Sequence, residues 1–273
     1  MRTIAIMNQK GGVGKTTSTV NLSAALAAAG QRVCVLDLDP QAHASLHLGV
    51  TVREGERSIY DCLAGDLLLQ EVRQQVGDNL WLVPAHLDLA AAEVELAGEV
   101  GREVILRDKL AQDDTTFDYL LIDCPPSLGV LTINALTMAR EVFLPLQPHF
   151  LALHGLSKLL KTIEVVAQRL NRDLKLTGVV LCMYDAGTRL ATEVSEDVTR
   201  YFDRAPSPTA ATARAFTTRI RRNVRLAEAP SFGQSILEYA PTSHGAEDYR
   251  NLAKEVLAMP AAKSMPQAAS RAA

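Results

Sequence analysis

The chain has 273 residues, of which 48% are hydrophobic, so it can bury the core of one α/β domain. Its 28 lysines and arginines against 31 aspartates and glutamates give a net charge of −3, which excludes a protein-wide positive field for nucleic acid and leaves only a local patch. The four cysteines are widely spaced with no CxxC pair, which argues against a disulfide framework, a zinc site or a cluster clamp and fits a reducing cytoplasm.

Short apolar runs of the strand type alternate with helical patterns along the chain, which is typical of a parallel sheet with helices on both faces. The strand candidates are Thr3–Met7, Val33–Asp37, Leu80–Val83, Tyr119–Asp123, Val142–Leu146 and Leu176–Cys182. Between the first two, Thr16–Ala29 is rich in alanine and leucine and stops at Gly30, so we expect a helix there. Apolar residues recur at three- and four-residue spacing over Leu153–Leu170, which predicts an amphipathic helix on the sheet. The expected fold is a single-domain, mostly parallel, twisted sheet with helices on both faces.

Neither apolar stretch that could signal export or membrane insertion is long enough. The N-terminal run turns polar at Asn8, too early for the apolar region of a signal peptide. The uncharged run at 142–157 contains Pro145 and Pro148 and falls below the roughly 18 apolar residues that a spanning helix needs. We therefore expect a cytoplasmic protein with no membrane partner.

A glycine-rich segment lies between the first predicted strand and the first predicted helix, where a phosphate-binding loop belongs. Its glycines let backbone amides turn toward phosphates, Lys15 can bridge the outer phosphates, and the Thr16 hydroxyl can bind Mg²⁺. The usual first glycine is Gln9, and an extra lysine, Lys10, follows it. The nucleotide-binding residues expected here are Gly11, Gly12, Val13, Gly14, Lys15, Thr16 and Thr17. The segment predicts a P-loop NTPase that binds ATP with Mg²⁺.

Carboxylates at the ends of two predicted strands complete this site. Asp123 ends an apolar strand, so its side chain emerges at the carboxyl edge of the sheet, where it can hold a Mg²⁺-bound water. Asp39 comes two residues after Asp37, and Pro40 then turns the chain away. A carboxylate there can orient the attacking water, because phosphoryl transfer depends on positioning and electrostatics more than on a strong base. The candidate metal-binding residues are therefore Thr16, Asp39 and Asp123.

Four motifs spread over most of the chain carry a family resemblance: KGGVGKTT at 10–17, VLDLDPQA at 35–42, LIDCPPS at 121–127 and RNVRLAEAPSFG at 222–233. They resemble the ParA/MinD group of P-loop ATPases with a deviant Walker motif, and within it the ParA/Soj-type partition ATPases. In that group the extra lysine, here Lys10, reaches across a nucleotide-sandwich dimer to the partner's phosphates. The resemblance therefore implies an ATP-dependent homodimer in which Lys10, Lys15 and Asp39 are the catalytic residues.

The same resemblance assigns further residues. It implies that Asp37 is structural or lies near the metal. It also implies that Arg222 and Asn223 belong to a segment that closes over the adenine. The family usually has proline before Arg222, whereas this chain has Arg221. The resemblance thus implies adenine contact by Arg222 and Asn223, in a segment that departs from the family pattern at Arg221.

Positive charge is concentrated in the C-terminal third of the chain, where six arginines stand against one acid between Asp203 and Arg225. Together with an arginine from the 183–189 segment, they predict a surface that binds DNA without sequence preference and in a salt-sensitive way. The candidate DNA-binding residues are Arg189, Arg219, Arg221, Arg222 and Arg225. The resemblance points the same way, since Soj-like proteins bind nucleoid DNA through arginines in these two regions; the alternative is a solvated charged face.

The resemblance implies a slow ATPase that a ParB-like partner stimulates and that drives chromosome or plasmid partition as a cytoplasmic, nucleoid-associated protein. A ParA-like positioning ATPase for a protein array or another large assembly would carry the same core motifs and is the alternative. We expect the ATPase domain to span 1–259, with a mobile insert at about 203–214 and a disordered tail at 260–273.

Three related kinds of protein do not fit. A MinD-like membrane ATPase needs a C-terminal amphipathic helix, but 260–266 holds two prolines and no apolar face. A reductase like the nitrogenase iron protein needs paired later cysteines, and Cys182 stands alone. An operator-binding partition protein would carry a helix-turn-helix ahead of a first strand that begins here at residue 2 or 3. His149 and His154 have no matching ligand triad and are expected to be structural.

Overall fold

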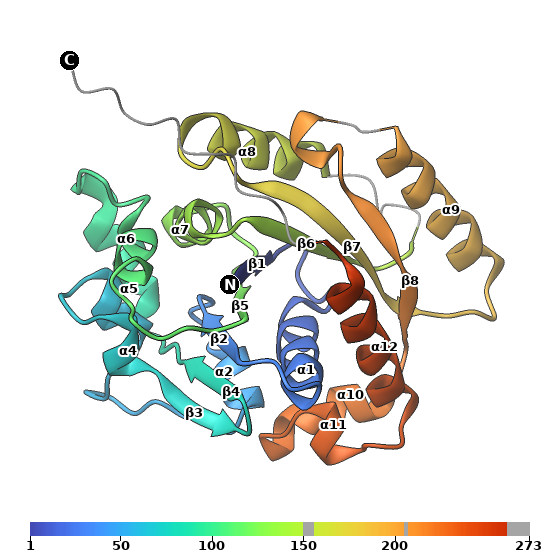
Figure 1. Cartoon of the computed structure of the whole chain (residues 1–273), viewed down its shortest axis with the longest axis horizontal. Helices are drawn as coiled ribbons and strands as arrows, with labels where there is room; N and C mark the ends of the chain where they lie inside the picture. Colours follow the sequence, from blue (N-terminus) through green and yellow to red (C-terminus); the bar gives the residue numbers. More distant parts are fainter. Residues whose placement is uncertain (150–155, 205–206, 261–273) are drawn as a thin grey trace.

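The computed structural model of the chain describes residues 1–149, 156–204 and 207–260. Within these ranges one sheet has the strand order β3-β4-β2-β5-β1-β6-β7-β8 (Figure 1). Its strands are β1 (Arg2–Ile6), β2 (Val33–Asp37), β3 (Gln74–Gly77), β4 (Leu80–Val83), β5 (Tyr119–Asp123), β6 (Glu141–Leu146), β7 (Lys175–Tyr184) and β8 (Arg214–Arg221). All neighbouring strands run parallel except β3 and β4. The carboxyl ends of β2, β5 and β1 therefore lie next to one another at one edge of the sheet.

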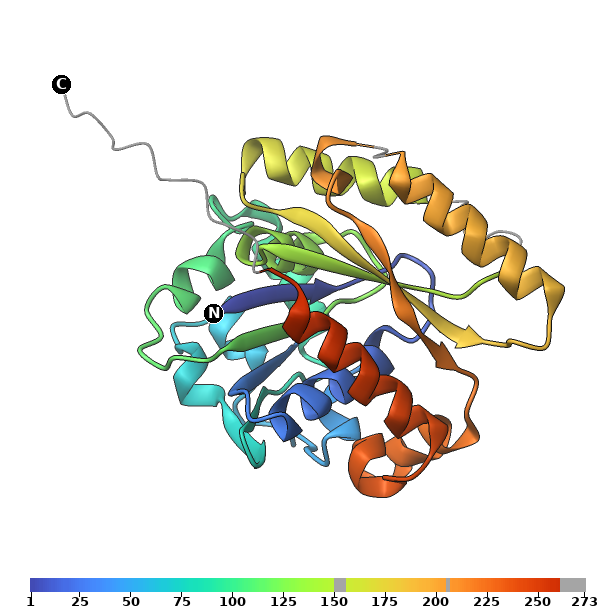
Figure 2. The same ribbon diagram turned by 45° about the vertical axis from the view of Figure 1, so that its right-hand side comes forward.

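Helices cover both faces of this sheet (Figures 1 and 2). The α-helices in the described ranges are α1 (Lys15–Ala28), α2 (His43–His47), α3 (Ile59–Leu63), α4 (Leu69–Val72), α5 (Leu89–Glu95), α6 (Ile105–Leu110), α7 (Val130–Met138), α8 (Leu156–Arg169), α9 (Arg189–Asp203), α10 (Val224–Glu228), α11 (Ile236–Tyr239) and α12 (His244–Ala258). Short 3-10 helices are η1 (Leu96–Gly98), η2 (Pro208–Ala210) and η3 (Ala229–Phe232). Along the described part of the chain, no helix combines the length and apolar character that crossing a bilayer would require.

Alternation along the strands divides the core into two layers. In β1, Ile4 and Ile6 belong to the layer formed with α1 and α12, whereas Ala5 belongs to the layer formed with α7 and α8. Because both faces are covered, the central strands are continuous apolar runs rather than alternating ones. This packing holds the carboxyl edge of the sheet rigid, and the loops that follow β1, β2 and β5 start there.

The predicted fold class is confirmed, and every predicted strand is present with its ends shifted by at most two residues. The helix predicted for Thr16–Ala29 is α1, and the one predicted for Leu153–Leu170 is α8, whose predicted first residues at 153–155 lie outside the described part. Strands β3 and β8 were not predicted. In β8 only Phe216 and Ile220 are fully buried, so the apolar signal is weak.

The edge strand β8 is covered by a helix instead of another strand. The carboxylate of Glu255 in α12 accepts hydrogen bonds from the backbone N–H groups of Thr217 at 2.9 Å and Thr218 at 2.6 Å. Backbone donors at an open edge otherwise invite pairing with a second chain. The contact therefore both blunts this edge and joins β8 to α12.

The segment predicted as a mobile insert at about 203–214 carries structure where it is described. Helix α9 continues to Asp203, η2 packs against α8 and β7, and β8 begins at Arg214. Ala210 and Ala213 are buried in the core. Their small side chains allow close packing without large apolar residues. Of the predicted tail at 260–273, all but Pro260 lies outside the described residues.

Helix α2 carries a buried histidine, His47, which is 1% exposed. Its Nε2 atom has no hydrogen-bond partner among the described residues. Burial lowers the pKa of His47 to about 4, from an ordinary value of 6.5. The unfolded chain takes up this proton near the ordinary pKa and the folded chain only near the lowered one, so acidification through this window should destabilise the fold.

Replacing His47 with leucine should remove this contribution to acid sensitivity. Relative to the variant, the wild-type chain should lose on the order of 2 to 3 kcal/mol of unfolding free energy as the pH falls from about 7 to about 4.5. Urea unfolding of both nucleotide-free proteins over a pH series measures this difference. Parallel pH profiles would show that His47 does not titrate as its burial implies.

Candidate nucleotide-binding site

The loop after β1 enters α1 through glycines with a left-handed backbone. Gly12 has a φ of 70° and Gly14, the N-cap of α1, has a φ of 94°, a region that favours glycine. Asn8 fixes the start of the loop: its Nδ2 donates to the carbonyl of Pro145 at 2.8 Å, and its Oδ1 accepts from the N–H of Lys10 at 3.0 Å. The loop amides and the amino end of α1 together favour an anionic ligand.

The two lysines of the loop point to different places. Lys15 is 8% exposed, lines the cavity beside the loop, and has its Nζ 3.5 Å from the carbonyl oxygen of Lys10. The Lys10 ammonium instead contacts Nε2 of His149, and Lys10 is absent from the described residues that line this cavity. Burial and the charge of Lys10 lower the pKa of His149, which favours the neutral ring. His149, expected to be structural, is thus a partner of Lys10; His154 lies outside the described residues.

Asp123 is buried at the end of β5, directly beneath the loop. Its carboxylate oxygens accept hydrogen bonds from the hydroxyls of Thr16 at 2.7 Å and Thr19 at 2.9 Å. Its register partner in β2 is Asp37. Burial raises the pKa of Asp123, and the neighbouring charge of Asp37 raises it further. A bound cation would offset both effects, so the hydroxyl of Thr16 and the carboxylate of Asp123 fit a Mg²⁺ site.

The two aspartates after β2 differ in what they contact. The Oδ2 atom of Asp37 accepts from the backbone N–H and the hydroxyl of Ser45, at 2.8 Å each, and its Oδ1 accepts from the N–H of Asp39 at 3.2 Å. Asp37 therefore ties the end of β2 to α2. Asp39 lines the cavity beside the loop, and its Oδ1 accepts from the N–H of Gln41 at 3.0 Å. Of the two carboxylates, that of Asp39 is the one placed to reach a ligand.

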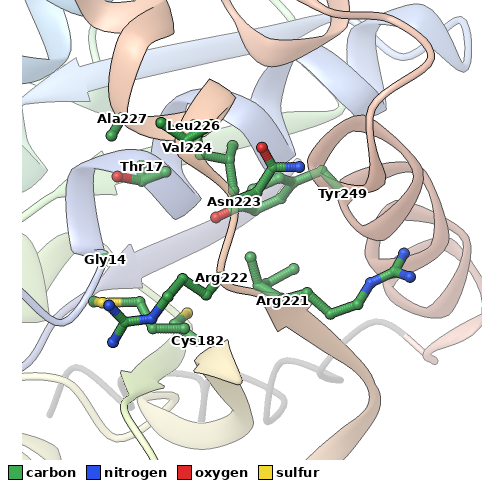
Figure 3. Close-up of a pocket in the computed structure, with 12 residues that line it drawn as sticks. Gly14, Thr17, Cys182, Arg221, Arg222, Asn223, Val224, Leu226, Ala227 and Tyr249 are labelled. Carbon is green, nitrogen blue, oxygen red and sulfur yellow. The ribbon is translucent and has the colours of Figure 1, made fainter. Parts of the chain in front are cut away.

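These residues line two cavities that meet at the start of α1. The first, of about 720 Å³, is bordered by the loop at 11–17, by residues 39–41 after β2 and by residues 125–127 after β5. The second, of about 420 Å³, is lined mainly by the end of β8 and the segment after it, with the end of β7, the start of α1 and Tyr249 of α12, and its wall is mostly apolar (Figure 3). Gly14, Thr17 and Met183 line both cavities. The site therefore has a polar end and an apolar end that adjoin at these three residues.

Residues of the apolar end come from distant parts of the sequence. Arg222 and Asn223, singled out from the sequence, line it as members of the segment after β8. Met183 and Tyr249 also line it and were missed, because no local motif marks them. The Tyr249 hydroxyl lies 3.2 Å from the hydroxyl of Ser18 in α1, so α12 closes against the helix that follows the loop. One indication of Met183 was present in the sequence: it begins the 183–189 segment, which was singled out only because it contains Arg189.

The predicted DNA-binding arginines separate into two groups. Arg189, Arg222 and Arg225 are exposed. Strands β7 and β8 stay paired as far as Tyr184 and Arg221, and the N–H of Arg222 donates to the carbonyl of Tyr184 at 3.1 Å. The segments that follow these strands therefore leave the sheet next to each other, which brings the three exposed arginines to the same edge.

Arg219 and Arg221 belong to the second group, whose side chains are engaged within the chain. The half-buried guanidinium of Arg219 donates to the Ser195 hydroxyl at 3.2 Å and to backbone carbonyls of its own strand. The guanidinium of Arg221 forms ion pairs with Glu247 and Asp248. The guanidinium groups of Arg219 and Arg221 are thus held by contacts within the chain, and the DNA contact predicted for these two residues stays a prediction.

All four cysteines are free and buried. Burial raises the pKa of the Cys34 and Cys62 thiols to about 12 and that of Cys182 to about 11, so these groups stay neutral. Cys124, next to Asp123, is likewise buried with a raised pKa. The four cysteines therefore pack as small apolar residues.

The glycine loop between a buried strand and a helix, with two strand-end aspartates beside it, defines a P-loop nucleotide-binding protein. Residues 1–176 match the family model described as AAA domain. The chain is 47% identical over 256 residues to the sporulation initiation inhibitor protein Soj of Bacillus subtilis, covering 93% of this chain and 98% of that protein. It is 45% identical over 258 residues to the chromosome-partitioning ATPase Soj of Treponema pallidum, covering 94% and 97%. The chain belongs to the Soj/ParA family of chromosome-partitioning ATPases.

A solved structure shares this fold. The fold is similar to that of cobyrinic acid a,c-diamide synthase from Mycobacterium smegmatis with a bound ATP analogue and magnesium, with a TM-score of 0.79, 36% identity and 94% of each chain covered. The resemblance drawn from the four motifs is confirmed.

Proposed function

We propose that the chain binds ATP with Mg²⁺ across the two adjoining cavities, the triphosphate against the loop at 11–17 and the adenine in the apolar cavity. The observation that carries this proposal is their meeting at Gly14, Thr17 and Met183. A polar cavity of about 720 Å³ next to an apolar one of about 420 Å³ suits the two ends of a nucleoside triphosphate. The related Mycobacterium smegmatis structure holds an ATP analogue and magnesium.

The residues around the polar cavity have distinct roles in this proposal. Lys15 contacts the outer phosphates, since its side chain lines that cavity. Thr16 and Asp123 hold Mg²⁺, with Asp39 as a further candidate ligand; the ion, when bound, neutralises charge on the phosphates. Asp39 orients the attacking water, because its carboxylate lines the cavity after β2. Arg222 and Asn223 contact the adenine from the segment after β8.

Two ATP-bound copies of the chain pair through their nucleotide faces, and Lys10 contacts the phosphates of the facing copy. The position of Lys10 supports this role, since its ammonium contacts His149 while Lys15 alone of the two lysines lines the cavity. Lys10 leaves His149 when the second copy presents its triphosphate. Hydrolysis, slow in isolation and stimulated by a ParB-like partner, removes the γ-phosphate between the copies and lets them separate.

In the dimer, Arg189, Arg222 and Arg225 contact DNA phosphates without reading sequence. Arg189 and Arg225 form pairs with Glu193 and Glu228, but both pairs are exposed and of the kind worth only about 0 to 1 kcal/mol, so phosphates can replace these carboxylates. Two copies double the contacts and raise the affinity. The chain thus acts in chromosome or plasmid partition, associated with the nucleoid, as its relatives named Soj do in chromosome partitioning.

Changing Arg189 to glutamate tests the DNA surface without touching the nucleotide cavities. With ATP and Mg²⁺ present, affinity for random-sequence DNA should fall roughly tenfold, and the slope of log affinity against log salt should become shallower by about 1. Arg172→Glu is the matched control, because Arg172 is exposed and precedes β7 at the opposite edge of the sheet. Fluorescence anisotropy over a salt series measures both quantities. Equal weakening in the two variants would mean that net charge, and no surface at this edge, governs binding.

A further inference from the structure

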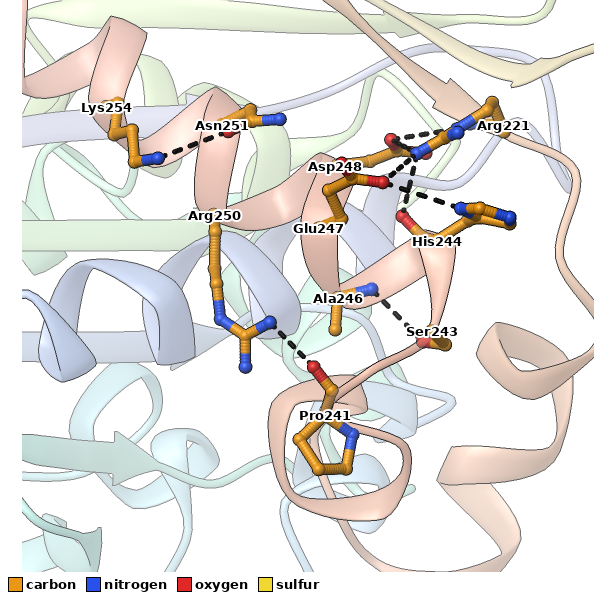
Figure 4. A network of polar contacts seen from close by, with 10 residues as sticks. All are labelled: Arg221, Pro241, Ser243, His244, Ala246, Glu247, Asp248, Arg250, Asn251 and Lys254. Atoms are coloured by element: carbon orange, nitrogen blue, oxygen red, sulfur yellow. Dashed lines mark hydrogen bonds and ion pairs between the residues drawn. The ribbon is translucent and has the colours of Figure 1, made fainter.

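Arg221 joins the end of β8 to α12 through one buried carboxylate (Figure 4). The carboxylate of Asp248, which is 6% exposed, accepts from the backbone N–H of Arg221 at 2.9 Å and from its Nε at 3.0 Å, with Nη2 at 2.5 Å. The same Nη2 donates to Glu247 at 2.7 Å. Because Arg221 commits both backbone and side chain to a buried partner, this contact is far less free to rearrange than an exposed ion pair.

The next residue on each side of this ion pair lines the apolar cavity (Figure 3). Arg222 follows Arg221 in the segment after β8, Tyr249 follows Asp248 in α12, and Arg221 itself also borders the cavity. In the close-up, the Arg221 guanidinium points away from Gly14. Arg221 is thus placed to set the spacing of the walls rather than to hold the ligand with its charge.

The Tyr249 wall is tied to the phosphate end of the site as well. Its hydroxyl lies 3.2 Å from that of Ser18, one turn into the helix that begins at the glycine loop. A continuous series of contacts therefore runs from the loop through α1 and α12 to the ion pair and the end of β8. If the pair opened, the end of β8 would lose its side-chain link to α12 next to the segment at 222–227, while the loop itself would keep its own contacts.

We propose that Arg221 is a positioning residue for the nucleobase: through Asp248 it holds the two walls of the apolar cavity at the separation that fits adenine. This inference rests on the proposed function, which assigns adenine to that cavity. A preformed slot spares the ordering of its walls when the base binds, so the pair contributes to base affinity and leaves phosphate affinity unchanged. The pair does not reach the residues assigned to hydrolysis.

The test compares ligands with and without a base. Dissociation constants of the full chain for ATP and for inorganic tripolyphosphate, each with Mg²⁺, are measured by competition against a ribose-labelled fluorescent ATP. In Arg221→Met the dissociation constant for ATP should rise about tenfold, a loss of about 1.4 kcal/mol, with that for tripolyphosphate unchanged. Asp248→Asn should show the same selective change, Arg221→Lys should recover part of it, and kcat at saturating ATP should stay at the wild-type value. Arg250→Met, an exposed arginine of α12 bonded to the Pro241 carbonyl, is the control.

The possible results distinguish failure of the positioning role from failure of the proposed function on which it rests. If the wild-type chain binds ATP no more tightly than tripolyphosphate, the assignment of adenine to this cavity fails and the inference falls with it. If the wild type prefers ATP and Arg221→Met keeps the full preference, only the positioning role is overturned. Equal weakening for both ligands, with a lowered melting temperature, would show that the pair merely holds the fold together; Asp248→Asn and Arg221→Lys then repeat the test in milder form.

Discussion

Lys15→Ala is expected to weaken ATP binding by roughly 100-fold or more, a loss of about 3 kcal/mol, and to abolish turnover. The physical reason is that Lys15 is buried and lines the polar cavity, so its charge acts on the outer phosphates through a region of lower dielectric than bulk water. Isothermal titration with ATP and Mg²⁺ measures the affinity. Wild-type affinity in this variant would place the triphosphate somewhere other than the loop at 11–17.

The neighbouring lysine provides the matched comparison. Lys10→Ala should bind ATP nearly as well as the wild type, because Lys10 does not line the cavity, yet it should remain a monomer with a non-hydrolysable ATP analogue and Mg²⁺. Sedimentation velocity with and without the analogue separates the two states. An ATP-dependent dimer formed by Lys10→Ala would contradict the proposed contact across the interface, whatever its affinity for nucleotide.

Asp39→Ala is expected to bind ATP and dimerise while its kcat falls roughly 100- to 10,000-fold, the range typical of losing a group that positions or deprotonates a nucleophile. Its carboxylate borders the polar cavity and accepts a local bond from the Gln41 N–H, so removing it should leave the fold intact. Phosphate release in single-turnover reactions measures the chemical step, and DNA binding of the variant should persist after ATP is added.

Asp37 is the control for this variant, since the two carboxylates differ in what they hold. Asp37→Asn weakens the attachment of β2 to Ser45, so it should lower the melting temperature, whereas Asp39→Ala should not. Retained turnover in Asp39→Ala would assign the positioning of water to another group that borders the cavity.

The phosphate end of the site and the centre of the fold could be predicted because their causes are local. Gly12 and Gly14 adopt backbone conformations that favour glycine, and Asp123 is the last residue of an apolar strand. Alternating strands and helices then place these residues at one edge, since parallel strands end on the same side. Each of these features depends on residues that are close together in the sequence, so each can be recognised as a sequence pattern.

The apolar end of the site left a weaker pattern, which was confined to the motif at 222–233. Met183 and Tyr249 come from β7 and α12, and β8 has too few buried residues to stand out as a strand. Arg221 counted as one more positive charge in a basic stretch until the fold placed Asp248 against it. Whether an arginine faces solvent or a buried carboxylate depends on which helix packs beside it.

The sequence by itself determined the class of protein, the phosphate loop and the catalytic aspartate candidates, because backbone geometry and strand order follow from short-range chemistry. Only the tertiary structure shows which arginines remain exposed, which residues line the apolar cavity and which residue Lys10 contacts. The cavity wall and the position of Lys10 depend on contacts between segments more than a hundred residues apart, such as Ser18 with Tyr249 and Lys10 with His149. Arg219 and Arg221 are engaged by Ser195 and Asp248, which lie nearer in the sequence but on other helices, and only packing of the whole chain brings all these segments together.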